Sequence, residues 1–159
     1  ASCGLFTKVS YNTSQEFKNL FGHLAYVLEG AKDLTKITAY NVKLETEDCV
    51  YEGKYIFGAV SNTTSVGGIL KLDKDMVKMN DGLFEIVLVK YPNNINDLRK
   101  IILGCTKADF TGDVFEFTKA KSARFTFENP MDWSVDGEHE LTDGEAVIEN
   151  LEKSATIII

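Results

Sequence analysis

The sequence is poor in cysteine and histidine. Its three cysteines, Cys3, Cys49 and Cys105, are widely spaced and form no CxxC pair. This pattern argues against a disulfide framework or a zinc site, and it predicts buried thiols in a reducing compartment. One of the two histidines, His23, lies within a predicted helix, where a packed or surface imidazole is the simpler interpretation.

Several signatures of common protein classes are missing as well. No apolar run is long enough to cross a bilayer and the first residues have no signal-peptide pattern, so we expect a cytoplasmic protein. There is no GxxxxGK[ST] phosphate loop, GxGxxG, HExxH or GxSxG motif. The net charge of −7 argues against unaided binding to nucleic acid or to an anionic membrane.

What remains is an ordinary globular composition with strand-rich patterning. The 159 residues, 44% of them apolar, can form one domain with a real core, or one piece of a larger protein. Strands are expected at Ile37–Glu45, Lys54–Ser61, Leu83–Tyr91, Val114–Ala120, Ser122–Glu128, Glu145–Leu151 and Ala155–Ile159. Many short strands at near-regular spacing predict two packed antiparallel sheets.

Two short helices complete the prediction. Thr13 and Glu16 form a capping box, an apolar stripe follows at helical spacing, and Gly30 is a plausible end. A second helix is expected from Asn96 to Gly104. The predicted fold class is therefore mainly β (α+β), a two-layer antiparallel β-sandwich with two short helices.

Two acidic turns are the candidate sites. Asp136-Gly137 is a strong signal for a type I′ hairpin turn, and the strand that leaves it opens with Glu138. A tight turn could hold Glu138 still as a catalytic acid or base, or the segment could simply be a soluble hairpin tip. In a strand, the adjacent His139 would point to the opposite face, so the two cannot act as a pair. Trp133 is expected in the core or in a cleft wall.

The second acidic turn is Asn80-Asp81-Gly82, which leads into an apolar strand. Asp81 and nearby backbone carbonyls offer the oxygen ligands that a hard cation such as Mg²⁺ accepts. Alternatively, the Asp81 side chain only shapes its own turn. Both interpretations stay open on the residues alone.

Four segments, taken in order, resemble a known family: GLFTKVSYNTSQEFKNLFGHLAYVLEG, VSNTTSVGGI, NDGLFEIVLVK and WSVDGE. Together they are similar to the C-terminal domain of the bacterial soluble diacylglycerol kinases, within the wider family of sphingosine kinases and related lipid kinases. The resemblance implies a two-lobe enzyme whose N-terminal lobe binds the nucleotide through a GGDGT loop. This sequence has no GGDGT. Residues 1–159 are therefore expected to be a single domain, the C-terminal β-sandwich lobe without its nucleotide-binding lobe, and to be inactive alone.

The resemblance also implies roles for named residues. It places the general base on Glu138, and a largely structural Mg²⁺ site on Asp81 with the backbone carbonyls of Lys78 and Leu83. The implied activity is ATP-dependent phosphorylation of the hydroxyl of diacylglycerol or a similar lipid alcohol, as part of phospholipid biosynthesis. ATP would be bound mainly by the missing lobe, and the full-length protein would work peripherally at the inner membrane face, with a homodimer left open. The alternatives are a stand-alone lipid- or metabolite-binding β-sandwich without catalysis, and a structural interaction domain.

Overall fold

The structure is a computed structural model that describes residues 1–5, 34, 37–66, 70–73, 75, 77–152 and 154. The predicted first helix with His23, and the strand expected at Ala155–Ile159, lie outside the described residues.

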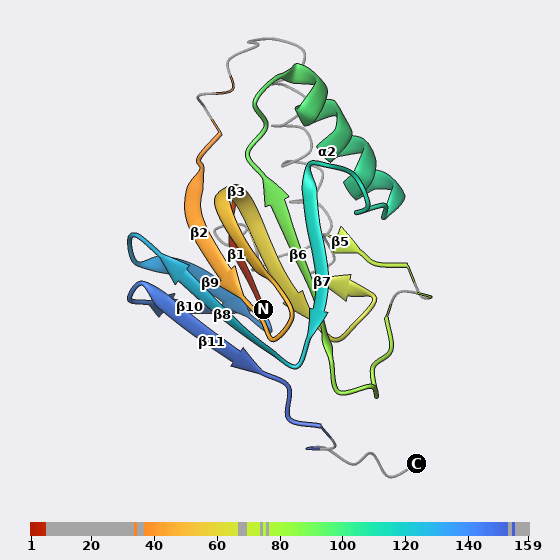
Figure 1. Cartoon of the computed structure of the whole chain (residues 1–159), viewed down its shortest axis with the longest axis vertical. Helices are drawn as coiled ribbons and strands as arrows, with labels where there is room; N and C mark the ends of the chain where they lie inside the picture. The colour runs from red at the N-terminus through yellow and green to blue at the C-terminus, as the bar shows by residue number, and fades with distance from the viewer. Residues whose placement is uncertain are drawn as a thin grey trace.

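The described residues are mostly β-strand, with one helix (Figure 1). The elements are β1 (Ser2–Gly4), β2 (Tyr40–Glu45), β3 (Val50–Ser61), β4 (Ser65–Val66), β5 (Leu70–Lys71), β6 (Phe84–Lys90), α2 (Ile95–Lys107), β7 (Phe115–Ala120), β8 (Ser122–Phe127), β9 (Met131–Val135), β10 (Glu138–Thr142) and β11 (Glu145–Glu149). The predicted strands that fall on described residues are all present, to within a few residues at their ends.

Strand β3 organises the main sheet. Along one edge it pairs with β6; along the other it pairs first with β2 and then with β1. Nine described strands join into one sheet, with the path β10-β9-β1-β3-β2-β8-β11 and with β6 and β7 branching from β3. Every pairing in this sheet is antiparallel.

The predicted fold class is confirmed, and the layers arise in a way that the patterning did not reveal. Two arms, β1-β9-β10 and β2-β8-β11, leave the same edge of β3 and face each other (Figure 1). The register of β3 against β6 shifts between Tyr55 and Phe57, as at a β-bulge, which bends a strand and increases its twist. Aromatic rings fill the space between the arms: Phe125 of β8 meets Trp133 of β9 edge to face, with centroids 5.2 Å apart. The layers are therefore parts of one continuous sheet.

Two apolar cores lie on opposite sides of β3, β6 and β7. Alternate residues of β6 divide between them, because successive side chains of a strand point to opposite faces. Val87 and Val89 pack under α2, whereas Ile86 and Leu88 pack between the two arms. This division confirms that β6 is buried on both faces.

The cysteines occupy these cores or their edge. Cys3 lies between the arms and Cys105 lies on the buried face of α2, and burial raises the pKa of each thiol to about 12. Cys49 is half-buried, with its sulfur 3.1 Å from Thr46 Oγ1. All three are free thiols. The prediction of buried thiols thus holds fully for Cys3 and Cys105, and only in part for Cys49.

Helix α2 is longer than predicted. It begins after Asn94, whose side-chain oxygen accepts the Asp97 N–H, and it continues through Lys107 to a left-handed Ala108. Gly104 was expected to end the helix, but it lies inside it for a packing reason. A Cβ at this position would lie 2.4 Å from a carbon of the Phe115 ring.

One charged residue interrupts the apolar run of β6. The Glu85 side chain is fully buried, and Lys119 Nζ on β7 lies 3.1 Å from its Oε1. Within the described part of the chain, this contact is an ion pair, and neither carboxylate oxygen of Glu85 accepts a hydrogen bond. Since a buried charge is strongly destabilising when unpaired, Glu85 depends on Lys119.

Replacing Gly104 with alanine tests the close approach of α2 to Phe115. Alanine normally favours a helix over glycine by about 1 kcal/mol. Here we expect Gly104→Ala to lower the free energy of unfolding by ~1–3 kcal/mol, because the methyl group overlaps the ring. Urea denaturation measures the change. Gly112→Ala is the matched control, since its Cβ would meet Phe115 only at 3.9 Å. A Gly104→Ala variant as stable as the wild type would contradict this packing.

Removing Lys119 tests the buried ion pair. We expect Lys119→Met to lower the free energy of unfolding by ~2 kcal/mol, because it leaves the Glu85 carboxylate without its cation. The double variant Glu85→Leu/Lys119→Met should recover most of that loss. The control is Lys100→Met, whose ion pair with Asp113 is exposed to solvent, so its removal should change the free energy of unfolding much less. Equal losses in both single variants would argue against the buried pair.

Candidate functional site

The β9–β10 hairpin forms as the sequence predicted. Asp136 has φ 50° and Gly137 has φ 92°, the two positive values that a type I′ turn requires. Five residue pairs join β9 to β10, beginning with Val135 opposite Glu138. The turn therefore holds Glu138 at the first position of a paired strand.

Glu138 is exposed, and its surroundings follow from the register. Directly opposed residues on neighbouring strands present their side chains on the same face. The Glu138 side chain therefore leaves the hairpin on the face that carries Val135, a residue that lines a cavity of about 590 Å³. Two other cavity residues, Asp136 and Gly137, form the turn itself. Glu138 thus lies at the edge of this cavity rather than within it.

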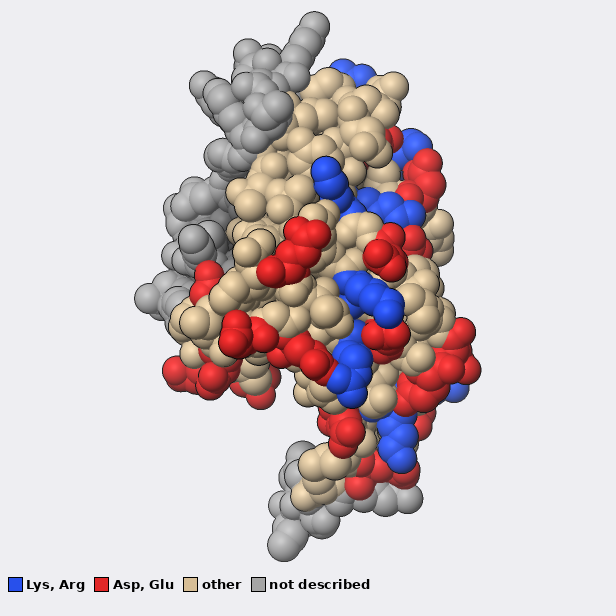
Figure 2. Space-filling model, turned by 60° about the vertical axis from the view of Figure 1, so that its left-hand side comes forward, with Lys and Arg blue, Asp and Glu red and all other residues tan. Residues whose placement is uncertain are grey.

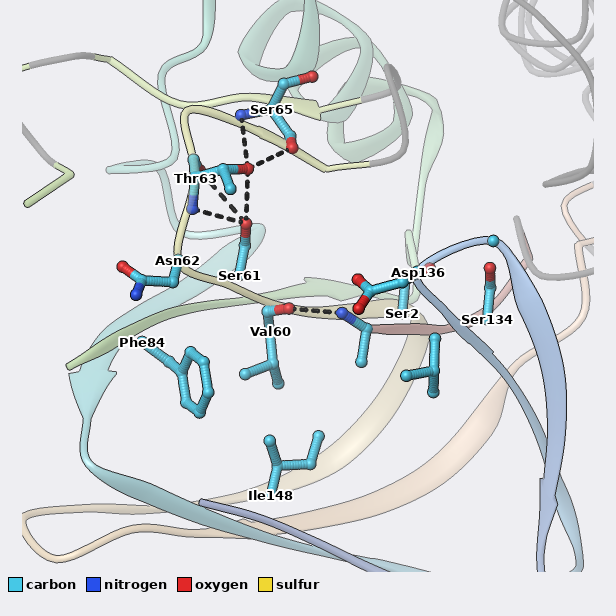
Figure 3. A pocket seen from close by; sticks show the side chains of 13 residues that line it. Ser2, Val60, Ser61, Asn62, Thr63, Ser65, Phe84, Ser134, Asp136 and Ile148 are labelled. Atoms are coloured by element: carbon cyan, nitrogen blue, oxygen red, sulfur yellow. Dashed lines mark hydrogen bonds between the residues drawn. The ribbon is translucent and has the colours of Figure 1, made fainter. Parts of the chain in front are cut away.

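The cavity lies where several strand ends meet (Figure 3). One part of its lining is polar, with hydroxyl groups from the start of β1, the end of β3 and the end of β9. The rest is apolar, formed by Val60, Phe84, Val135 and Ile148. Figure 3 shows Val60 and Ile148 approaching each other from opposite sides of this space.

Hydroxyl groups shape the loop that follows β3. Ser61 Oγ lies 3.2 Å from Thr63 Oγ1 and accepts the Thr63 N–H, while Thr63 Oγ1 donates to the Ser65 carbonyl at 2.6 Å (Figure 3). Asn62 Nδ2 donates to the Met79 carbonyl, whereas its buried Oδ1 has no hydrogen-bond partner among the described residues. Through Asn62, the cavity wall is tied to the segment that leads into the Asp81 turn.

The Asp81 turn closes on its own side chain. Asp81 Oδ1 accepts the Leu83 N–H at 3.0 Å, and the Asp81 N–H donates to the Lys78 carbonyl at 3.3 Å. The interpretation that Asp81 shapes its turn is therefore realised in the structure. Because a carboxylate has lone pairs beyond the one that Leu83 uses, the turn can still offer oxygens to a hard cation.

A second carboxylate lies against this turn. Gly82 has φ 76°, and a Cβ there would lie 3.5 Å from Glu152 Oε2. Among the described residues, no three Asp, Glu, His or Cys side chains gather as a metal site. A cation held by Lys78, Asp81 and Leu83 would thus depend on backbone carbonyls and water. Mg²⁺, which usually keeps several waters, fits such a donor set.

Other residues singled out in the sequence have structural positions. His139 Nε2 lies 2.9 Å from Asp132 Oδ1 on the neighbouring strand, so the imidazole is engaged by a residue other than Glu138. Trp133 is buried and meets the Phe125 and Phe127 rings, which makes it a core residue.

Sequence reasoning missed the cavity. Its walls come from strand ends that are far apart in the chain, such as Ser2, Ser61 and Ser134. The hydroxyl-rich stretch SNTTS was visible in the sequence, but nothing local placed it beside the β9–β10 turn. Glu85 could have been noticed, because it is a single charge within an apolar strand.

Among the described residues, the face shown in Figure 2 has no basic patch. On the face in Figure 2, basic side chains run in a column flanked on both sides by acidic ones. Ion pairs such as Lys43–Glu45, Lys90–Glu116 and Arg124–Glu145 neutralise much of the positive charge of the sheet. No helix among the described residues has the length and apolar character to span a membrane.

Comparison with known proteins gives a consistent result, although no family model matches the chain. The diacylglycerol kinase of Bacillus subtilis strain 168 is 27% identical over 139 residues, which are 87% of this chain and 46% of that protein. The diacylglycerol kinase of Staphylococcus epidermidis strain ATCC 12228 is 30% identical over 140 residues, or 87% and 44% of the two chains. The chain thus spans a little under half the length of these relatives.

A solved structure shares the fold. It is that of a provisionally assigned diacylglycerol kinase from Bacillus anthracis strain Sterne, with a TM-score of 0.61, 23% identity, and coverage of 94% of this chain and 50% of that one. The predicted resemblance is thereby confirmed: over most of its length, this chain is similar to one part of the bacterial diacylglycerol kinases.

Proposed function

We propose that this chain is the C-terminal, substrate-side lobe of an ATP-dependent lipid kinase that phosphorylates the hydroxyl of diacylglycerol or a similar lipid alcohol. The observation that carries the proposal is the exposed Glu138, fixed by a type I′ turn at the edge of a 590 Å³ cavity. The matched relatives are about twice as long as the matched region, which supports a second, nucleotide-binding lobe.

Glu138 is proposed as the general base. Phosphoryl transfer relies mostly on positioning and on charge neutralisation, with little covalent help from the protein. The acceptor hydroxyl oxygen attacks the terminal phosphorus of ATP, the bond from that phosphorus to the ADP oxygen breaks, and the hydroxyl proton passes to the Glu138 carboxylate. A carboxylate is a common general base, and Glu138 is exposed where an acceptor could reach it.

The Asp81 turn is proposed as a structural Mg²⁺ site. Its ligands would be an Asp81 carboxylate oxygen and the Lys78 and Leu83 carbonyls, completed by water. The bound ion would hold the turn that precedes β6, and with it Phe84 of the cavity lining. Its contribution would be to stability more than to the reaction.

The proposal also implies a location for the full-length enzyme. Its acceptor has acyl tails in a bilayer, so the full-length protein would bind peripherally at the inner membrane face. With a net charge of −7, this chain would leave the basic docking residues to the other lobe. That lobe would also supply most of the contacts to ATP.

Replacing the base tests the proposal. In the full-length protein, Glu138→Gln should keep nucleotide affinity and lower kcat for dioctanoylglycerol by about 100-fold or more, since general-base catalysis contributes roughly that much. The measurement is ATP-dependent phosphorylation with a radiolabelled γ-phosphate. Glu140→Gln is the matched control, because Glu140 is exposed, two residues along β10 and on the same face. The isolated chain should show no activity and serves as the blank. Near-normal turnover by Glu138→Gln would rule out this base.

A thermal-shift experiment tests the metal site. Asp81→Ala should lower the melting temperature more in Mg²⁺ than in EDTA, because only the wild type gains stability from the bound ion. The control is Asp73→Ala, whose carboxylate likewise accepts a backbone N–H two residues ahead, from Asp75. That variant should lose the same amount in both buffers. Equal losses for Asp81→Ala in both buffers would leave Asp81 as a turn residue only.

A further inference from the structure

The chain contains three Asp-Gly pairs, and each glycine has a positive φ: Asp81-Gly82, Asp136-Gly137 and Asp143-Gly144. An aspartate before glycine is open to a slow reaction within its own backbone. The glycine nitrogen attacks the carboxyl carbon of the aspartate side chain, which closes a five-membered imide ring and releases water. Glycine favours this attack because it has no Cβ to hinder the approach. Hydrolysis of the ring consumes a water and leaves either aspartate or isoaspartate.

The Asp136-Gly137 pair is the least restrained of the three. Both residues are exposed, and nothing lies within 4 Å of a Cβ placed at Gly137. The β9–β10 pairing begins at Val135 and Glu138, so the peptide that joins Asp136 to Gly137 lies outside the ladder. Among the described residues, none donates a hydrogen bond to the Asp136 carboxylate, and the Ala1 amino group attracts it without forming an ion pair. Neither reacting group is therefore held in place by a hydrogen bond.

The other two pairs are held more firmly. Asp81 Oδ1 accepts the Leu83 N–H at 3.0 Å, which engages the carboxylate that cyclisation requires. The Gly144 carbonyl accepts the Phe127 N–H at 2.8 Å, which anchors the backbone next to Asp143. Groups that must first be released by local opening react more slowly, because only the open fraction of the molecules can react. The structure thus ranks the three pairs in a way that their shared dipeptide does not.

We propose that Asp136-Gly137 is a site of spontaneous isoaspartate formation, and that this modification displaces Glu138. In the first step the Gly137 nitrogen bonds to Asp136 Cγ, and one carboxyl oxygen leaves as water with the carboxyl and amide protons. In the second step water adds to the main-chain carbonyl carbon of Asp136, and the bond from that carbon to the Gly137 nitrogen breaks. The backbone then runs through Cβ and Cγ of Asp136, and a carboxylate remains on its Cα.

The added backbone atom matters because this turn has only two residues between paired strands. The length of a tight hairpin loop fixes the register of its strands. Val135 opposite Glu138 is the first pair of the ladder, so a longer turn would disturb that pair before any other. The modification itself requires neither lipid nor nucleotide. Only its effect on turnover rests on the proposed function.

Ageing of the full-length protein in water enriched in heavy oxygen tests the proposal, because each ring hydrolysis installs one heavy oxygen. Digestion at glutamate separates the peptides that hold Asp136 and Asp143, since Glu138 and Glu140 lie between them. Mass spectrometry would follow the label, and isoaspartyl methyltransferase with radiolabelled S-adenosylmethionine would count isoaspartate. We expect Asp136 to gain both labels several-fold faster than Asp81 or Asp143. Equal rates at the three sites, or no label at Asp136, would overturn the proposal.

Two controls separate the structure from the local sequence. In guanidinium chloride the three pairs lose their different restraints, so their rates should converge. Rates that keep the folded order after unfolding would contradict the structural basis. Asp136→Gly removes the reacting carboxyl and leaves a Gly-Gly pair, which suits a type I′ turn. This variant should gain no isoaspartate in that peptide.

The effect on Glu138 is measured by turnover. Aged wild type should lose phosphorylation of dioctanoylglycerol in proportion to its isoaspartate content, and methyltransferase repair should restore it. Asp136→Gly should keep its own starting turnover over the same period. If isoaspartate forms at Asp136 without loss of turnover, Glu138→Gln decides the cause. An inactive Glu138→Gln enzyme would then overturn the displacement of Glu138, whereas an active one would instead rule out the proposed base.

Discussion

The antiparallel ladders of β3 are the constraint on which the rest of the structure depends. This strand pairs along both edges, and its register places Ser2 opposite Ala59 and Ser61 opposite Glu85. The start of β1, the end of β3 and the start of β6 consequently meet at one end of the sheet. The cavity forms at that end, where side chains are no longer covered by a neighbouring strand. A shift of the β3 register would move its lining residues to other faces and dismantle the cavity.

The residues that stabilise the fold and the candidate functional residues lie in different parts of the structure. Buried apolar side chains on both sides of β6 stabilise the middle of the sheet. The same packing must accommodate the buried Glu85, which is paired with the partly exposed Lys119. The candidate functional groups lie instead on turns at the strand ends, as is common when a rigid scaffold positions a site. Glu138 and Asp136 belong to one such turn, and Asp81 belongs to another.

The charge distribution of the chain agrees with a lobe that binds the acceptor lipid rather than ATP. On the sheet surface, basic side chains pair with acidic neighbours, as Lys90 does with Glu116. The described lining of the cavity offers hydroxyl groups and apolar side chains, with the Asp136 carboxylate near the amino group of Ala1. Groups that would neutralise the phosphates of ATP are therefore expected in the other lobe that we propose. Acceptor binding by this chain and ATP binding by another lobe would be consistent with a chain that spans a little under half the length of its matched relatives.

The sequence by itself determined the features that depend on near neighbours. The positive φ values at Asp136 and Gly137, the Asn94 cap of α2 and the buried strand β6 each follow from a few adjacent residues. Tertiary structure alone decided the single continuous sheet, the place of Gly104 within α2, the partner of Glu85 and the cavity. Each of these depends on which distant segments pair and in what register, because a β-sheet joins residues through hydrogen bonds that leave no periodic trace in either strand's own sequence.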